Sequence, residues 1–162
     1  MTERTTAMDS RATELVDAFA GSRWWEALQE LGCLAYLDHH ADVETLEKVI
    51  PLLHDPKSDV RLWAVHTLGC DRCKPGENPL DVEPMLIERA LHDESLRVRR
   101  QAVVSLAYLR PPDPRSAALF ARILEGETDR KLVLHATAGL RKARAVGVEP
   151  RTETRARETG ER

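Results

Sequence analysis

The chain has 162 residues, of which 42% are hydrophobic, 31% are charged and only 4% are aromatic, and its formal net charge at pH 7 is −3. This length suits one domain with a sizeable core, and the scarcity of aromatic residues predicts that Leu, Ala and Val fill it. The near-neutral charge excludes a protein whose whole surface attracts nucleic acid. No apolar run approaches the roughly 20 residues of a membrane-spanning helix.

The cysteines and the first residues bear on the cellular compartment. The N-terminus is polar and lacks the apolar segment of a signal peptide. Cys33, Cys70 and Cys73 form an odd set that cannot pair completely, which is typical of a reducing environment. We therefore expect a cytoplasmic protein. Most basic residues are arginines and Asn78 is the only asparagine, a bias that indicates a GC-rich, bacterial genome.

Apolar residues spaced three and four apart predict helices along most of the chain. The expected helices run over about residues 11–20, 23–37, 42–54, 59–72, 81–91, 96–109, 113–124 and 129–142. Asp42, Asp81 and Asp113 are expected to cap the helices that they begin, and Pro51 should bend its helix because it removes a backbone donor. We expect residues 1–8 to be a flexible lead-in. Residues 143–162 lose the apolar periodicity, so we predict a disordered charged tail.

Part of the sequence recurs after 38 residues. The matching pairs are His54 and His92, Arg61 and Arg99, Ala64 and Ala102, and Leu68 and Leu106. A degenerate earlier copy matches Ala27 to Ala64, and a later copy matches Ala136 and Leu140 to Ala102 and Leu106 at an offset of 34. A period of this size indicates an array of helix pairs.

The repeated pattern is Asp-Pro, a short turn, Val-Arg, and then Ala and Leu-Gly at helical spacing. It resembles the HEAT repeat family, and within it the short repeats of phycobilin-lyase-like proteins. The residues that carry it are Asp55, Pro56, Val60, Arg61, Ala64, Leu68 and Gly69, and then Asp93, Val98, Arg99, Ala102 and Leu106. The resemblance covers about residues 9–142. Trp24 and Val133 replace the arginine in the outer copies, where terminal repeats are expected to be atypical because each has one neighbour.

This resemblance implies an all-α protein, a right-handed α-α superhelix of about four helix pairs. Such an armadillo-like α-solenoid offers a scaffolding surface, and the resemblance implies no reaction. For Arg61 and Arg99 we favour a structural role, in which an arginine of one repeat binds an aspartate of its neighbour.

The resemblance also places the second helix of each pair on the concave side. Helical spacing turns two rows of these helices outward, and the rows are unusually apolar for solvent. We predict that they bind another protein or a peptide segment, and that the protein is a monomer or a weak homodimer. The predicted partner-binding residues, called the second-helix face below, are Trp25, Leu62, Trp63, His66, Arg100, Val104 and Leu134. Trp63 has the alternative role of filling a gap between repeats, and the C-terminal tail could instead cover the face.

Three other functions stay open at this stage. Arg97, Arg99 and Arg100 make a local basic patch that could contact nucleic-acid phosphates. Trp63, Asp59 and Arg100 are residue types that solenoid glycosylases place around an extruded base, although no basic groove or catalytic motif accompanies them, and we expect no enzymatic activity. We expect no cofactor, with zinc as a weaker alternative. The candidate zinc ligands are Cys70, Cys73, Cys33, His39 and His40.

Overall fold

The computed structural model describes residues 43–70 and 78–150, and within them it contains helices but no strand. The elements in order are α3 (Val43–Val49), η2 (Ile50–His54), α4 (Ser58–Gly69), α5 (Glu83–His92), α6 (Leu96–Tyr108), α7 (Pro114–Gly126) and α8 (Arg130–Ala145). The 3₁₀ helix η2 continues α3. The predicted first helix pair, with Trp24 and Trp25, lies outside the described residues.

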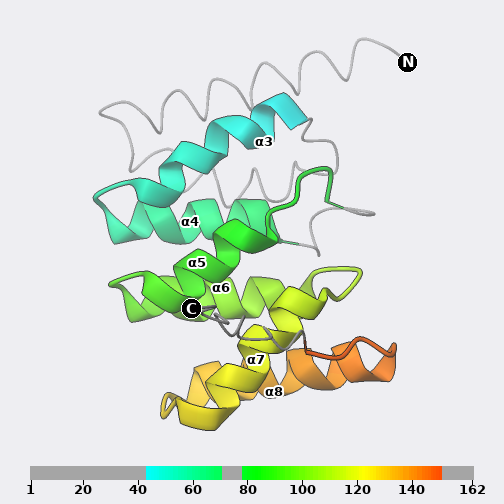
Figure 1. The fold of residues 1–162 in the computed structure, drawn as a ribbon. Helices are drawn as coiled ribbons and strands as arrows, with labels where there is room; N and C mark the ends of the chain where they lie inside the picture. Colours follow the sequence, from blue (N-terminus) through cyan, green and yellow to red (C-terminus); the bar gives the residue numbers. More distant parts are fainter. Residues whose placement is uncertain (1–42, 71–77, 151–162) are drawn as a thin grey trace, which may run out of the picture.

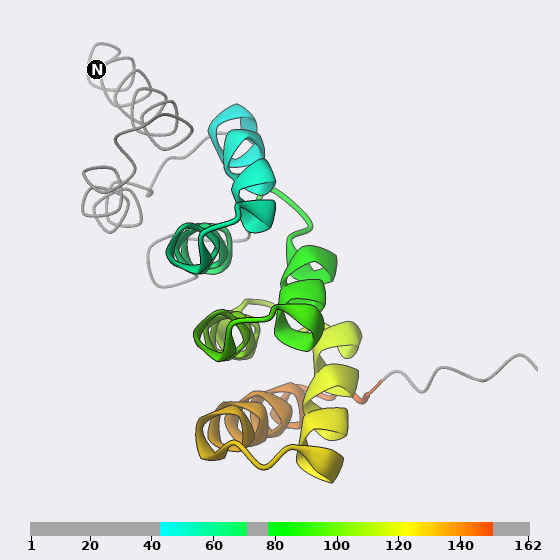
Figure 2. The same ribbon diagram turned by 90° about the vertical axis from the view of Figure 1, so that its left-hand side faces the viewer.

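The helices form two layers. Figures 1 and 2 show α4, α6 and α8 side by side in one layer, with α3, α5 and α7 crossing them in the other. Each first helix packs against the second helix of its pair, and α6 packs against both α4 and α8. The stacked pairs confirm the predicted all-α solenoid for the part of the chain that the structure describes.

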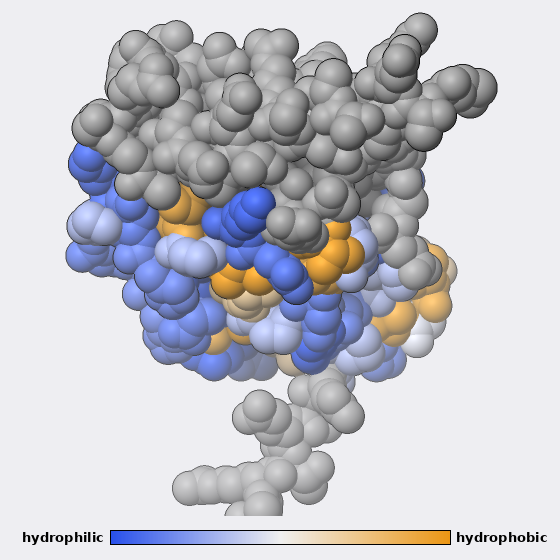
Figure 3. Space-filling model, turned by 90° about the horizontal axis from the view of Figure 1, so that it is seen from above, coloured by the Kyte–Doolittle hydropathy of each residue, from blue (hydrophilic) through white to orange (hydrophobic). Residues whose placement is uncertain are grey.

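The core is aliphatic, as the composition predicted. Ala64, Ala102 and Ala136 occupy equivalent places in α4, α6 and α8 and are completely buried. Phe120 is the one aromatic side chain in the buried core of the described residues. Seen from above, hydrophilic side chains cover most of the described surface, and hydrophobic ones form small separate groups (Figure 3).

Gly69 marks the closest approach between α4 and the following repeat. A Cβ atom at this position would lie 2.5 Å from the Ser105 Cβ and 2.8 Å from the Leu86 Cδ1. Real Cβ atoms do not approach other heavy atoms so closely. The glycine of the Leu-Gly pattern therefore serves the packing of one repeat on the next.

The helix ends agree with the predictions at two places and differ at a third. Asp113 caps α7 by accepting a hydrogen bond from the backbone N–H of Arg115 at 2.7 Å. Next to Pro51, where a bend was predicted, the chain changes from α-helix to 3₁₀ helix. The predicted cap by Asp81 was wrong. Helix α5 begins at Glu83 without a side-chain cap, and Asp81 binds Arg115 of the next repeat instead.

Helix α8 continues to Ala145, three residues past the predicted end of the repeat domain at 142. Ala143 is buried, and the basic residues around it suit the negative end of a helix dipole. Gly147 follows the helix with a positive φ of 78°. The predicted tail from residue 151 onward lies outside the described residues. None of the described helices is long and apolar enough to cross a membrane.

Candidate functional site

The second-helix face extends across three neighbouring helices. Leu62, Trp63 and His66 lie on α4, Arg100 and Val104 lie on α6, and Leu134 lies on α8; all but Leu134 are half-buried, and Leu134 is 63% exposed. Trp25, the remaining predicted member, lies outside the described residues. The face thus offers partly exposed apolar side chains on helices that pack against one another (Figure 2).

Polar contacts join α4 to α6 within this face. Gln101 Nε2 lies 3.3 Å from His66 Nδ1, and the Trp63 ring meets the His66 ring edge-on, with centroids 5.5 Å apart. Trp63 also packs against the hydrophobic core. The packing agrees with the alternative role of Trp63, a side chain that fills a gap next to the core, and leaves the residue half-buried.

Arg100 is already bound to another residue of the chain. Its Nε donates to Asp129 Oδ1 at 3.0 Å, and its Nη2 makes a second, shorter bond to Asp129 Oδ2. The hydrogen bond from Arg100 holds the pKa of Asp129 well below its usual value, and the backbone N–H of Leu132 adds to the effect. An acidic group of a partner would have to compete with Asp129. The positive charge of Arg100 is therefore already paired within the chain.

Arg61 makes the inter-repeat contact that the sequence predicted. Its Nε donates to Asp93 Oδ2 at 2.8 Å and its Nη2 donates to Asp93 Oδ1 at 3.0 Å, while its Nη1 binds the Asp55 carbonyl oxygen. The Arg61 side chain is 6% exposed and that of Asp93 is completely buried. Burial by itself would raise the pKa of Asp93, but the hydrogen bonds from Arg61 and from the Ser95 N–H outweigh it and lower the pKa.

Arg99 does not repeat this ion pair. Its Nη1 binds the Asp93 carbonyl oxygen at 2.9 Å and approaches that of Glu94. These contacts correspond to the carbonyl contacts of Arg61 with the turn before α4, but the ion pair of Arg61 has no counterpart. Among the described residues it has no carboxylate partner. The prediction of a bridging aspartate was therefore right for Arg61 and wrong for Arg99.

The basic patch at Arg97–Arg100 is largely neutralised within the molecule. Arg97 binds Asp59 of the preceding repeat at 2.9 Å, Arg99 binds backbone carbonyl groups, and Arg100 binds Asp129. Phosphate groups would have to displace these contacts. The geometry argues against the nucleic-acid alternative at this place.

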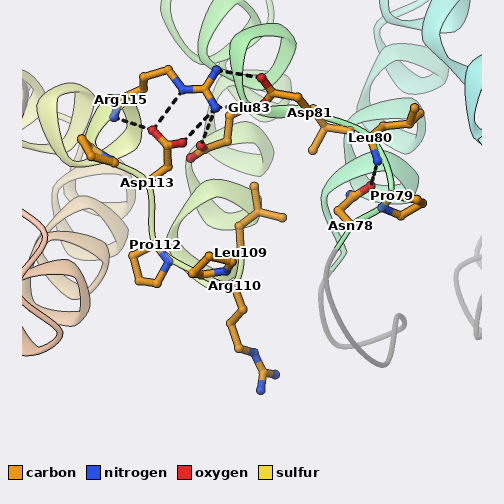
Figure 4. Close-up of a pocket in the computed structure, with 13 residues that line it drawn as sticks. Asn78, Pro79, Leu80, Asp81, Glu83, Leu109, Arg110, Pro112, Asp113 and Arg115 are labelled. Carbon is orange, nitrogen blue, oxygen red and sulfur yellow. Dashed lines mark hydrogen bonds and ion pairs between the residues drawn. The ribbon is translucent and has the colours of Figure 1, made fainter.

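A pocket of about 310 Å³ opens where the start of α5 meets the start of α7 (Figure 4). Arg115 binds three carboxyl groups there: Asp81 at 2.9 Å, Asp113 at 2.8 Å and Glu83 at 3.3 Å. Figure 4 shows Arg110, also a lining residue, directed away from this cluster. The cluster joins the first helices α5 and α7 of two neighbouring repeats. The Arg61–Asp93 pair acts in the same way in the layer of second helices (α4, α6 and α8), called the inner layer below.

Glu83 is the buried member of the cluster and was not singled out from the sequence. Its carboxyl group accepts a short hydrogen bond from the Ser116 hydroxyl. Burial raises the pKa of Glu83 to about 7, and a hydrogen bond shared with Asp113 adds to the shift. Hydrogen bonding to Arg115 lowers the pKa of Asp113 to about 2. The sequence signal was weak, because an acidic residue in a first helical turn is ordinarily a solvated one that suits the helix dipole.

The zinc alternative is not tested by the structure. Cys70 is half-buried at the end of α4, and the other four candidate ligands lie outside the described residues. Within residues 43–70 and 78–150, no three His, Cys, Asp or Glu side chains are grouped to hold a metal ion.

The family model for HEAT repeats matches residues 46–141. The chain belongs to the HEAT repeat family. The match begins within α3 and ends within α8, so it spans the three described helix pairs of this HEAT-repeat protein. Comparison with curated proteins finds no match, and comparison with solved structures finds none either.

Proposed function

We propose that this HEAT-repeat protein is a non-enzymatic scaffold that binds a segment of another protein on the second-helix face. HEAT repeats commonly serve as surfaces for protein interaction. The observation that carries the proposal is the group of partly exposed apolar side chains on α4, α6 and α8, in which Leu134 has 63% of its surface exposed. A contiguous apolar surface of this kind usually marks a site that a partner covers.

The charges around the face favour an apolar ligand. Arg97 and Arg100 are held by Asp59 and Asp129, so the affinity should come from burial of apolar surface on Leu62, Val104 and Leu134. A helix that lays apolar residues into the face, or an extended peptide with apolar anchors, fits this chemistry. We place the adaptor in the bacterial cytoplasm, acting as a monomer or a weak homodimer.

The test compares polar substitutions on the two helix layers. The double variant Leu62→Gln, Val104→Gln changes the second-helix face, and Leu124→Gln changes an exposed leucine on α7, which belongs to the other layer. Arg100 is left unchanged, because its replacement would also free Asp129 and disturb the fold. Purified proteins with matched circular dichroism are used to capture proteins from native lysate at moderate salt, and bound proteins are quantified by mass spectrometry.

We expect a discrete set of proteins that the wild type and Leu124→Gln retain and the double variant loses. An affinity that persists as salt is raised would agree with an apolar interface, because charge pairs weaken with salt. Equal recovery by all three proteins, or no recovery by any of them, would refute binding through this face.

A further inference from the structure

Helix α8 carries more basic residues than any other described helix; α6 comes next, with three arginines and no acidic residue. Helix α8 has five basic residues and no acidic one, whereas α5 and α7 each contain both signs. The basic residues are Arg130, Lys131, Arg141, Lys142 and Arg144. The protein as a whole is slightly acidic, so this helix concentrates positive charge at one end of the stack.

Part of this charge lies on the side of α8 that corresponds to a buried side of α4 and α6. Val65 and Val103 are completely buried where the next repeat packs, and the equivalent residue of α8 is the exposed Thr137. Gly69, buried in α4, corresponds to the exposed Arg141. Helix α8 is the last described helix of the stack (Figure 1). Its exposed side, called the α8 outer face below, consists of Arg130, Leu134, Thr137, Arg141 and Arg144.

The arginines of the α8 outer face lack the carboxylate partners that four arginines elsewhere in the stack have. Arg61, Arg97, Arg100 and Arg115 each bind a carboxylate of a neighbouring repeat. Within the described part of the chain, Arg130 and Arg141 make no ion pair, and Arg144 only approaches Glu149 at 4.0 Å. These charges are therefore available for a carboxylate that the described residues do not supply.

Helix stability does not explain the charge pattern. Basic residues stabilise the last turn of a helix, which accounts for Lys142 and Arg144 but not for Arg141, and they are unfavourable in the first turn, where Arg130 lies. A face that merely ends the stack needs polar residues of either sign. The same sign at both ends of α8, with an exposed leucine between, points instead to a ligand.

We propose that the α8 outer face is a second docking surface, which binds an acidic protein segment carrying an apolar residue. Carboxylates of the segment pair with Arg130 and Arg141, which lie about 16 Å apart along the helix at a rise of about 1.5 Å per residue. The apolar residue covers Leu134, which is 63% exposed. Nucleic acid fits less well, because a phosphate backbone has no apolar group to offer the centre of the face. Leu134 borders both faces, but the two arginines belong to this one alone, and the proposal does not depend on the second-helix face.

The test uses a fluorescent helical peptide of alternating turns of Glu and Leu as the probe. Its binding to the full chain is followed by fluorescence anisotropy. The variant Arg130→Glu, Arg141→Glu reverses the two charges, and Arg130→Ala, Arg141→Ala removes them more gently if the first variant folds poorly. The control Arg122→Glu reverses an exposed arginine on α7. Competitors are a peptide with Lys in place of Glu, a duplex DNA, and vesicles containing anionic lipid.

We expect the charge reversal to weaken peptide binding at least about tenfold, which corresponds to about 1.4 kcal/mol, while Arg122→Glu changes it less than about twofold. Raised salt should weaken binding by the wild type. The Lys peptide should not compete. The proposal is overturned if the acidic peptide fails to bind, if Arg122→Glu is as harmful as the double variant, or if DNA or vesicles bind through Arg130 and Arg141 more tightly than the peptide does.

Discussion

Two successive junctions of the inner layer hold the repeats together in different ways. Between α4 and α6, Arg61 reaches Asp93, and both side chains are almost fully buried. Between α6 and α8, the repeat-equivalent Arg99 makes no such bond, and the next residue, Arg100, pairs with Asp129 at a half-exposed position. The comparison shows that a repeat can keep an ion pair between neighbours while moving it along the helix.

The reason for the move lies in the connections between helices. Asp93 precedes α6 and turns its carboxylate toward Arg61 and the Ser95 N–H. At the equivalent place before α8 stands Glu127, whose carboxylate instead accepts hydrogen bonds from the backbone N–H groups of Thr128 and Asp129. Asp129 then becomes the nearest acid, and it faces Arg100. A buried pair contributes more than an exposed one when a single partner is lost, because the remaining charge is stranded away from water.

The largest expected effect breaks the first junction. Arg61→Ala should lower the free energy of unfolding by about 3 kcal/mol, because it leaves Asp93 buried without its main partner. Arg99→Ala, at the equivalent position of the next repeat, should cost clearly less. Urea denaturation followed by circular dichroism measures both. Equal losses for the two variants would contradict the difference between the junctions.

A smaller effect tests how closely the first junction is packed. Gly69→Ala should destabilise the protein by about 1–3 kcal/mol, because the new methyl group would overlap Ser105 and Leu86. Gly126→Ala is the matched control. A Cβ there meets nothing within 4 Å, so this substitution should stabilise the chain by about 0.5 kcal/mol through the unfolded state. Thermal unfolding of the two variants should therefore shift in opposite directions, and a neutral Gly69→Ala would show that α4 and α6 can separate without loss.

A third effect extends the comparison to the layer of first helices and depends on pH. Because the pKa of Glu83 rises from its ordinary 4.5 to about 7 on folding, the folded state binds more protons between these values. Stability from this group is fully present below pH 4.5 and is lost as the pH rises toward 7. Glu83→Gln, which cannot ionise, should remove this slope while changing stability little at pH 5. The measurement is the urea midpoint from pH 5 to 8.

The inner-layer acids provide the control for that experiment, since their shifts have the opposite sign. The pKa values of Asp93 and Asp129 are lowered on folding, so their stabilisation is present above about pH 4 and is lost as the pH falls further. Glu83→Gln and the wild type should share this loss of stability at acid pH. A Glu83→Gln protein with an unchanged slope between pH 5 and 8 would show that Glu83 stays ionised in the fold.

Much of this architecture could be predicted from the residues alone. The recurrence of Val-Arg, Ala and Leu-Gly after 38 residues determined the helix pairs, their order and the aliphatic core, because helical spacing and burial depend on local pattern. The same local logic identified Asp113 as a cap and predicted that Arg61 would bind an aspartate of the next repeat. It also predicted two outward rows, whose apolar members Leu62, Val104 and Leu134 are partly or largely exposed.

Tertiary structure alone decided which charges are free. The sequence offered Arg61, Arg99 and Arg100 as similar candidates, yet the connection before each helix sets which acid comes within reach. The tertiary structure also decided that Glu83 is buried and that Asp81 binds Arg115 rather than capping its own helix. Pattern and spacing record which face of a helix turns inward. Pairing between repeats depends instead on positions set by the angle and distance between helices, which no single segment of the chain contains.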